Sequence, residues 1–387
     1  MRILLANILD DTEDAMLRKC IMLVLVALAG CADPQIEVGV HAGLQGGTIA
    51  RMAASGVRQS RATKDRRFDS RAIAQAAIVH DSLTPEILKT ALDSIVDDTL
   101  LVALISRFYM PTAVAATRDF NRVGLPYISV HPTAPELTGG ATWGFSLVPD
   151  YDKQAAFIAR NIGAGKRVAV LHIEDAYGRG MAAALVAALT AAGSPPTDVR
   201  RYEQSWDEPR MVALGHDTRS RQPEILVFAG RSPSLQLVIQ PFREAGEEIR
   251  VIGTDLVEST SVYDNPDGAL TGVQFVRFLN PRSEDERMKD LNGRYILWIG
   301  FGNITTEGVL TYDGVHLVGE AVRAGARTRS EVRDYLKSLG RSRPPFSGVG
   351  GLIAFGEDGQ VARNMELVEV QIGSWRVVAT DSAASRR

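Results

Sequence analysis

Four polar side chains follow closely after stretches that read as buried strands, and together they could bind a small charged solute. They are Thr133, Tyr177, Arg231 and Asp255. In an open α/β sheet, ligands bind beyond the carboxyl ends of the strands, so loops at these positions are candidate contacts. Threonine hydroxyls and arginine N–H groups can hold a carboxylate, and an aspartate can pair with an ammonium. Each residue also suits a structural role, as a turn residue, a core aromatic, a solvated charge or a cap.

The sequence contains one pattern typical of nucleotide-binding enzymes, a G-x-G-x-x-A run from Gly178 to Ala183. A lone match of this kind is weak, and Glu174 and Asp175 precede the glycines, where they would repel a pyrophosphate. The chain has no GxxxxGKS or GxxxxGKT, no HExxH and no GxSxG, and its six histidines lack the spacing of a metal site. We therefore expect a protein that is not an enzyme and holds no metal or cofactor, with a NAD-dependent enzyme as a remote alternative.

The beginning of the chain reads as an export signal. Two basic residues, Arg18 and Lys19, precede a short apolar run at 21–28, and a Leu-Ala-Gly-Cys sequence ends at Cys31. This order is typical of a secretory signal, and the run is shorter than the roughly 20 apolar residues of a membrane span. Leu-Ala-Gly-Cys resembles a bacterial lipobox, which implies that Cys31 is lipidated and becomes the new N-terminus. A short buried helix is the alternative.

Residues 1–30 are the expected signal peptide, and its true start is expected at Met16. The first fifteen residues contain four acidic side chains, which is unusual ahead of a signal. Cys20 then lies in the discarded signal and Cys31 carries lipid, so the mature domain has neither a disulfide nor a cysteine metal site. We expect a lipoprotein of the cell envelope that works outside the cytoplasmic membrane.

Length and composition predict a globular protein with two lobes. The chain has 387 residues, which exceeds one ordinary core, and it is 45% apolar and 23% charged. Its formal net charge of -3 argues against a general nucleic-acid binder.

Strand-like and helix-like stretches alternate from residue 36 to 253, which is typical of parallel sheets covered by helices on both faces. The expected strands are 36–40, 76–79, 100–105, 127–130, 168–173, 225–229 and 250–252. The expected helices are 85–97, 111–123, 155–162, 180–192 and 233–245. Further on, the pattern predicts helices at 306–324 and 329–339, then antiparallel strands at 352–355, 366–372 and 375–378. Segment 41–72 is the least legible, with at most one short helix before a surface loop.

Five segments resemble, in order, motifs of the type I periplasmic binding proteins of the branched-chain amino acid and amide class. They are VGLPYISVHPTAPELT (123–138), RVAVLHIEDAYGRGM (167–181), FREAGEEIRVIGTD (242–255), TYDGVHLVGEAVRAG (311–325) and FSGVGGLIAFGEDGQ (346–360). Each is weak alone. Together, behind a sequence that resembles a lipobox, they indicate that nearly all of the mature chain, 36–378, is similar to this family.

The resemblance implies an α/β fold of two Rossmann-like lobes with parallel sheets, joined by three hinge crossovers that let the cleft close around a ligand. It implies an N-terminal lobe of 36–148 plus 278–345, a C-terminal lobe of 149–277 plus 346–380, and a tail of 381–387. The protein would be a monomeric substrate-binding protein that captures an amino acid, an amide or a related acid for the permease subunits of an ABC importer. A ligand sensor of the same fold without transport is the alternative.

The resemblance also assigns ligand contacts. It implies that Thr133, Tyr177 and Asp255 touch the ligand from the two sides of the cleft. Pro132 stands where the family usually has alanine, at a position that lends only its backbone.

The sequence departs from the family at two ligand positions. After strand 100–105 the family has a glycine and then a serine that holds the ligand carboxylate, but here Met110 and Pro111 occupy the serine-like positions and only Thr112 offers a hydroxyl. Arg231 stands where the family often has an aromatic residue. Because arginine binds carboxylates in a bidentate way, these departures permit a more acidic ligand, held by Arg231 or Arg107.

Overall fold

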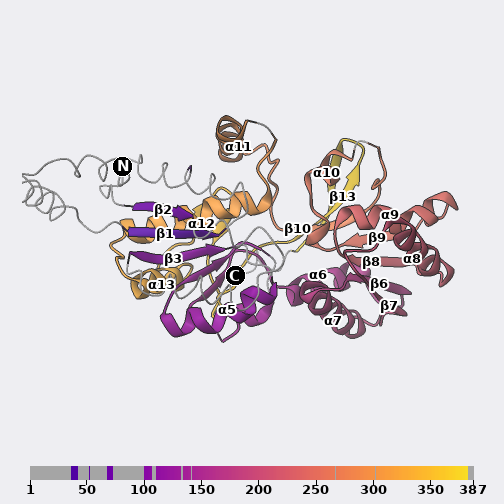
Figure 1. The fold of residues 1–387 in the computed structure, drawn as a ribbon, viewed down its shortest axis with the longest axis horizontal. Coiled ribbons are helices and arrows are strands. Elements are labelled where there is room, and N and C mark those ends of the chain that lie inside the picture. Colours follow the sequence, from indigo (N-terminus) through magenta and orange to yellow (C-terminus); the bar gives the residue numbers. More distant parts are fainter. Residues whose placement is uncertain are drawn as a thin grey trace, which may run out of the picture.

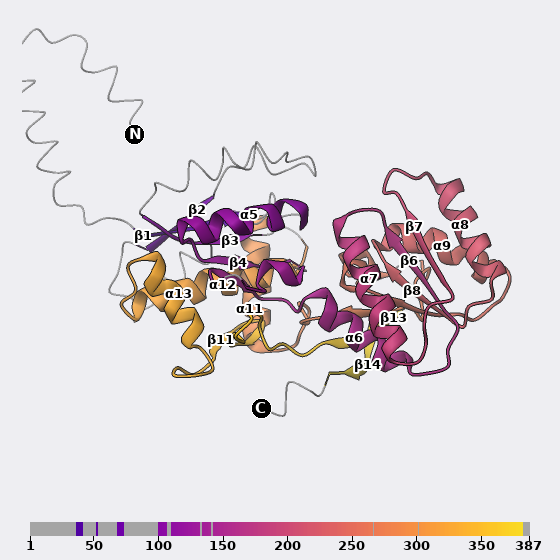
Figure 2. The same cartoon turned by 90° about the horizontal axis from the view of Figure 1, so that it is seen from below.

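The computed structural model describes residues 36–41, 52, 68–72, 100–106, 110–131, 134–140, 142–265, 267–300 and 302–381. Several predictions fall outside these ranges: the signal peptide with Cys31, the strand at 76–79, the helix at 85–97, Arg107, Pro132, Thr133 and the tail after residue 381. Across the described ranges, no helix combines the length and apolar character that a membrane crossing requires. Figures 1 and 2 show two lobes side by side, each built around one sheet.

The first lobe contains a five-stranded parallel sheet with the order β2-β1-β3-β4-β5. Its strands are β1 (Ile36–His41), β2 (Phe68–Ala72), β3 (Leu101–Ser106), β4 (Tyr127–Ser129) and β5 (Gly144–Ser146). The helices α5 (Met110–Val123) and α12 (Thr306–Arg323) lie on opposite sides of this sheet (Figures 1 and 2). The central strand β3 is therefore covered on both faces, which explains why its residues 101–105 are all apolar and buried.

The second lobe contains a seven-stranded sheet with the order β14-β13-β10-β9-β8-β6-β7. Five strands are parallel: β6 (Val168–Ile173), β7 (Asp198–Tyr202), β8 (Ile225–Ala229), β9 (Arg250–Gly253) and β10 (Gln274–Arg277). The last two, β13 (Glu366–Gln371) and β14 (Ser374–Thr380), are antiparallel, as predicted. The helices of this lobe are α6 (Tyr151–Ile162), α7 (Ala176–Ala191), α8 (Glu208–Ser220), α9 (Ser232–Glu244) and the short α10 (Thr260–Asp264).

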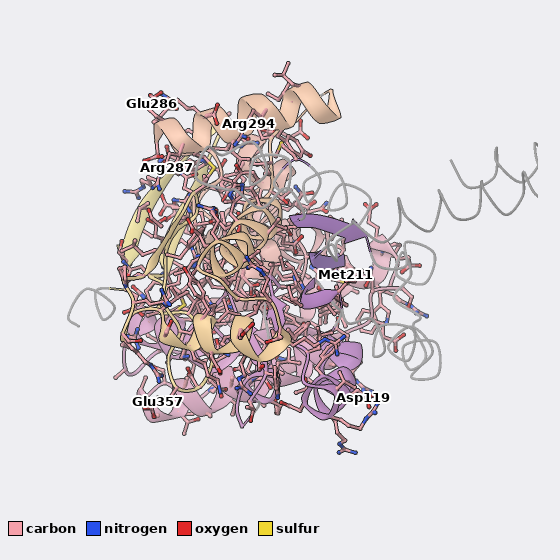
Figure 3. The ribbon with its side chains drawn as sticks, turned by 90° about the vertical axis from the view of Figure 1, so that its left-hand side faces the viewer. Asp119, Met211, Glu286, Arg287, Arg294 and Glu357 are labelled. Atoms are coloured by element: carbon pink, nitrogen blue, oxygen red, sulfur yellow. The ribbon has the colours of Figure 1, made fainter. Side chains whose placement is uncertain are left out.

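Three segments of the chain connect the lobes. They are 147–150 between β5 and α6, 278–285 between β10 and α11 (Glu286–Ile299), and 354–365 between β12 (Gly351–Ile353) and β13. α11 belongs with the first lobe because Arg294 donates from Nη2 to the Tyr312 hydroxyl of α12 at 2.6 Å. Figure 3 looks at the first lobe from its end and shows α11 with Arg294 at the top.

The short hairpin of β11 (Phe346–Gly348) and β12 also packs on the first lobe. The N–H groups of Val349 and Gly350 donate to the buried carboxylate of Asp313 on α12, at 2.8 and 2.7 Å. The sequence-based division placed 346–380 in the C-terminal lobe. These contacts instead favour a boundary after the hairpin, and the division into lobes remains our proposal with that change.

Polar side chains cap several helices of both lobes. Asp150, Asp175 and Asp207 accept hydrogen bonds from the first turns of α6, α7 and α8, and Thr305 does the same for α12. Such caps satisfy backbone donors that a helix start leaves free. They fix the point at which each helix begins after its strand.

Most predicted elements are confirmed, and the errors fall mainly on polar strands and helices. Segment 41–72 was expected to contain at most a short helix, but it ends in β2, which pairs in parallel with β1. The sequence analysis did not predict β5, β7, α8, α10, β10, α11 or β11. β2 and β7 lie at or near sheet edges, where one neighbour is missing and polar residues such as those of FDSRA and DVRRY are tolerated.

Candidate ligand-binding cleft

A cavity of about 310 Å³ lies between the two lobes, beyond the carboxyl ends of β4, β8 and β9. Its lining from the first lobe and the connecting segments is Val130, His131, Val148, Phe278, Pro281, Arg282, Asn303, Ile304, Thr305, Thr306 and Glu307. Its lining from the second lobe is Arg231, Asp255, Leu256, Glu258, Ser259 and Tyr263. The volume is at the small end of the range of ligand pockets, about 300–1,000 Å³, and suits a small solute.

Asp255 lies in this cavity, at the end of β9, and is held rigidly from behind. The buried amide of Gln154 on α6 donates from Nε2 to Oδ1 of Asp255 and accepts from its backbone N–H, both at 2.8 Å. Burial raises the pKa of Asp255 above its ordinary value, and these hydrogen bonds oppose that rise. Oδ1 is thus already engaged, and the acceptor capacity that remains is mainly on Oδ2.

Tyr177, which was predicted to touch ligand, does not line the cavity. Its side chain on α7 is only 3% exposed, and its hydroxyl donates to Oδ1 of Asp255 at 2.7 Å, with Oγ1 of Thr254 2.9 Å away. Burial, followed by the neighbouring Asp255 carboxylate, raises the pKa of Tyr177 well above the usual tyrosine range. This geometry favours a role in positioning Asp255, and direct contact with ligand remains a prediction.

Arg231 lines the cavity, in the loop that the sequence indicated, between β8 and α9. Its Nε is buried and has no hydrogen-bond partner in the part of the chain that the structure describes. The other guanidinium of the cavity, Arg282, is paired with Asp264 at 2.9 Å. Arg231 is therefore the cation with the most unused capacity to bind an anion.

Glu258 was not predicted, yet it connects the lobes within the cavity. Its Oε1 accepts hydrogen bonds from Tyr263 of the second lobe at 2.8 Å and from Thr306 of the first lobe at 2.6 Å. Burial raises the pKa of Glu258 to about 7, although both hydrogen bonds favour the ionised form. A Glu three residues after a predicted site Asp was the only sequence signal for it.

The first lobe contributes a second polar pair. Nδ1 of His131, just after β4, lies 2.9 Å from Oε1 of Glu307 in the first turn of α12. The two residues are 176 positions apart in the sequence. No local pattern could have joined them, since only the fold brings β4 and α12 together.

The remaining predicted contacts are less defined. Thr112 lies in the first turn of α5, and the description of the chain there is limited to its backbone. Thr133 and Pro132 adjoin His131 but fall outside the described residues. These three remain predictions.

The glycine-rich run at 178–183 serves packing. A Cβ on Gly178 would lie 1.8 Å from the carbonyl oxygen of Ile173, and one on Gly180 would lie 2.9 Å from the ring of Tyr151. The Gly178 N–H donates to the Asp175 carboxylate at 2.7 Å. An anion is therefore already present at the start of α7, where a nucleotide-binding loop would hold phosphate.

Taken together, the side chains of the cavity can hold a small solute that carries both charges. Arg231 can bind an acid group through its N–H donors, and Asp255 and Glu258 can accept from an ammonium. Apolar walls from Val130, Leu256 and neighbouring residues exclude water and strengthen these contacts. Among the described residues, no cluster of His, Cys, Asp and Glu side chains could hold a metal ion.

The chain is similar to several known proteins. An amino acid binding protein of Pseudomonas aeruginosa is 24% identical over 266 residues, which are 67% of this chain and 70% of that protein. A solved ABC transporter substrate-binding protein of Desulfitobacterium hafniense in complex with Leu has a TM-score of 0.69 and 19% identity, covering 89% of this chain and 100% of that one. A solute binding protein of R. palustris in complex with benzoate has a TM-score of 0.69 and 15% identity, covering 90% and 96%. At these identities the solved structures confirm the fold.

The family model described as periplasmic binding protein matches residues 77–374, well over half of the chain. This match confirms the resemblance seen in five sequence motifs, and the lobes, their parallel strands and the cavity between them agree with it. The chain therefore belongs to the periplasmic binding protein family, whose members bind solutes and are not enzymes.

Proposed function

We propose that this chain is a lipid-anchored receptor outside the cytoplasmic membrane that captures a small zwitterionic or acidic solute for an ABC importer. The observation that carries the proposal is the cavity between the lobes, where Arg231 has unused N–H donors and Asp255 has an unused oxygen. A ligand with an acid group and an ammonium would complement both.

The charge of the cavity supports an amino acid, an amino acid amide or a related acid as the ligand class. Asp255 and Glu258 accept from neutral donors within the described chain, and the nearby Glu307 faces His131. A simple anion would gain from Arg231 but would be repelled by the two acids, whereas an ammonium group offsets that repulsion. The relative from Pseudomonas aeruginosa, an amino acid binding protein, supports the same class.

A thermal-shift screen of the full-length protein against amino acids, amides, short peptides and small acids tests the proposed ligand class. A ligand at one hundred times its Kd stabilises the folded state by about 2.7 kcal/mol, which is a readily measured shift in melting temperature. Stabilisation by members of one of these classes is expected. If no compound in any class shifts the melting temperature, the proposed function is wrong.

Variants at the cavity then test the assigned contacts. Arg231→Ala should weaken binding of the best ligand about 10- to 100-fold, because a charge-assisted hydrogen bond contributes about 1.5–3 kcal/mol. Asp255→Asn should weaken the binding of ligands that carry an ammonium group more than the binding of ligands that lack one. Arg210→Ala, at an exposed arginine of α8 away from the cavity, is the matched control and should bind normally. Unchanged affinity in Arg231→Ala would refute its role.

The lipid anchor and the importer are tested in cells. Metabolic labelling with a palmitate analogue should mark the wild-type chain and leave Cys31→Ser unlabelled. Uptake of the identified ligand should depend on the protein and fall when Cys31 is replaced, because the anchor keeps the receptor beside the membrane. Ligand binding without any contribution to uptake would overturn the importer part of the proposal.

A further inference from the structure

Glu258 forms a hydrogen bond between the lobes through a titratable group. Its Oε1 accepts from the Tyr263 hydroxyl, which belongs to the same lobe, and from the Thr306 hydroxyl, which belongs to the other. Thr306 is the first residue of α12, next to the N-cap of that helix. Because the two residues lie in different lobes, we expect an opening movement of the cleft to separate Thr306 from Glu258 and to expose the carboxyl group to water.

Burial disfavours the charge of Glu258, and the charged groups around it are of both signs. The charged or titratable groups that line the same cavity or pack against it are Arg231, Asp255, Arg277, Arg282, His131 and Glu307. Asp255 repels the ionised form, whereas Arg277 favours it. Arg277 itself is buried and paired with Glu366 at 2.5 Å, so its charge is largely offset.

Two of the other cations of the cavity, Arg282 and His131, have partners of their own, whereas Arg231 keeps a buried Nε without one among the described residues. Arg282 pairs with Asp264 and lies over the ring of Tyr263 at 5.0 Å. His131 faces Glu307 at 2.9 Å. The carboxyl group of Glu258 is therefore buried in the cavity with two hydroxyl donors and no ion-pair partner among the described residues. Burying a carboxylate in this way is costly unless the group takes up a proton.

We propose that Glu258 couples cleft closure to proton uptake, so that the empty protein closes more readily as the pH falls. In the open cleft the carboxyl group is hydrated and ionised near neutral pH. On closure it loses that hydration, and a proton from solvent binds to the carboxylate. The proposal goes beyond the proposed function because it concerns the protein without ligand.

The direction and size of the expected pH dependence of closure follow from the linkage between proton binding and closure. Burial holds the pKa of Glu258 at about 7 in the closed cleft, against an ordinary value of 4.5. Because the closed form binds the proton more tightly, the closing equilibrium gains up to about tenfold per pH unit as the pH falls between these values. From pH 8 to pH 5 the closed-to-open ratio should rise on the order of 50–100-fold.

Distances between spin labels measure this equilibrium directly. The labels are placed at the exposed positions Arg118→Cys on α5 and Ala187→Cys on α7, in the full-length chain with Cys20 and Cys31 replaced by serine. Pulsed electron paramagnetic resonance without ligand then gives the open and closed populations from pH 5 to pH 8. The closed fraction of the wild-type sequence should rise steeply as the pH falls.

Three variants make the test decisive. Glu258→Gln carries a permanently neutral group and should close to the same extent at pH 5 and pH 8. Thr306→Val removes the donor from the other lobe and should lower the closed fraction most at pH 8, where the ionised carboxylate needs it. Glu357→Gln, at an exposed acid labelled in Figure 3, should retain the wild-type pH dependence.

Two outcomes would overturn the proposal. One is a wild-type closed fraction that does not change with pH, and the other is a Glu258→Gln variant that keeps the pH dependence. Neither outcome bears on ligand capture, because the ligand screen uses a different readout at fixed pH. Circular dichroism of each variant at both pH values confirms that it is folded before the distances are compared.

Discussion

The hydroxyl of Tyr177 should contribute more to stability at high pH than at low pH. It is almost fully buried and donates to Oδ1 of Asp255, on the side of that carboxylate away from the cavity. Tyr177→Phe removes this oxygen and leaves the ring in place. The variant separates a role in holding Asp255 from a role in packing against ligand.

The magnitude follows from the charge of the acceptor. A hydrogen bond to a charged group contributes about 1.5–3 kcal/mol, and one between neutral groups about 0.5–1.5 kcal/mol. Tyr177→Phe should therefore lower the free energy of unfolding by about 2 kcal/mol at pH 8. Because the pKa of Asp255 is raised, its neutral form is more populated at pH 4.5 than at pH 8, and the loss should be smaller there.

The expected direction, a larger loss of stability at high pH, agrees with the linkage between proton binding and folding. Burial raises the pKa of Asp255 in the folded protein, so its protonated form adds stability at low pH that is lost as the pH rises through the folded pKa. The Tyr177 hydroxyl opposes this loss because it favours the ionised carboxylate. Without the hydroxyl, the folded pKa rises further and stability falls more steeply with pH.

Urea unfolding followed by circular dichroism at pH 4.5 and pH 8 measures the effect. Tyr335→Phe is the matched control, since Tyr335 is only partly buried on α13 and its hydroxyl has no hydrogen bond among the described residues. The control should change stability by less than about 0.5 kcal/mol at either pH. Equal losses at both pH values, or equal losses in the two variants, would refute the assigned role of Tyr177.

Three further predictions concern the framework around the cleft. Asp313→Ala should lower the free energy of unfolding by about 2–4 kcal/mol, because two partly buried backbone N–H groups lose their buried acceptor; urea unfolding measures this loss. Burial lowers the pKa of His316 to about 4. The free energy of unfolding should therefore fall by up to about 1.4 kcal/mol per pH unit as the pH drops below about 6.5. His316→Leu should flatten this part of the stability profile in urea unfolding. Gly178→Ala should destabilise the folded protein by about 3 kcal/mol or more, because the added Cβ has no room. Gly293→Ala, in open space on α11, should stabilise the protein by about 0.5–1 kcal/mol, and urea unfolding measures both variants.

The buried parallel strands were the most predictable part of the fold. β3, β6 and β8 are covered on both faces, so their sequences are apolar except for Ser106 and His172 and can be recognised without an alignment. The C-terminal ends of helices were equally clear where a glycine follows, as at Gly163 after α6, whereas the starts of α6 and α7 were each predicted four residues too late. Polar edge elements such as β7 carry a weaker signal, because water or a neighbouring helix can satisfy their exposed side chains.

The candidate site was predictable only where it depends on one strand. Arg231 and Asp255 come directly after β8 and β9, so the rule that ligands bind beyond the carboxyl ends of strands found both. The same rule also selected Tyr177, but rotation of α7 turns its side chain into the core. Sequence gives the position of a residue after a strand, and helix packing decides the direction of its side chain.

Residues that act across the cleft could not be predicted, because their partners depend on how the lobes meet. Glu258 and Thr306 contact each other only where the lobes meet, in the cavity that the connecting segment 278–285 also lines. The same segment carries Arg282, which packs over Tyr263 and fixes the second hydroxyl that Glu258 accepts from. The connection that permits hinge motion is therefore also the one that sets the surroundings of the interlobe hydrogen bond. A substitution in this segment should change closure even where it leaves every ligand contact intact.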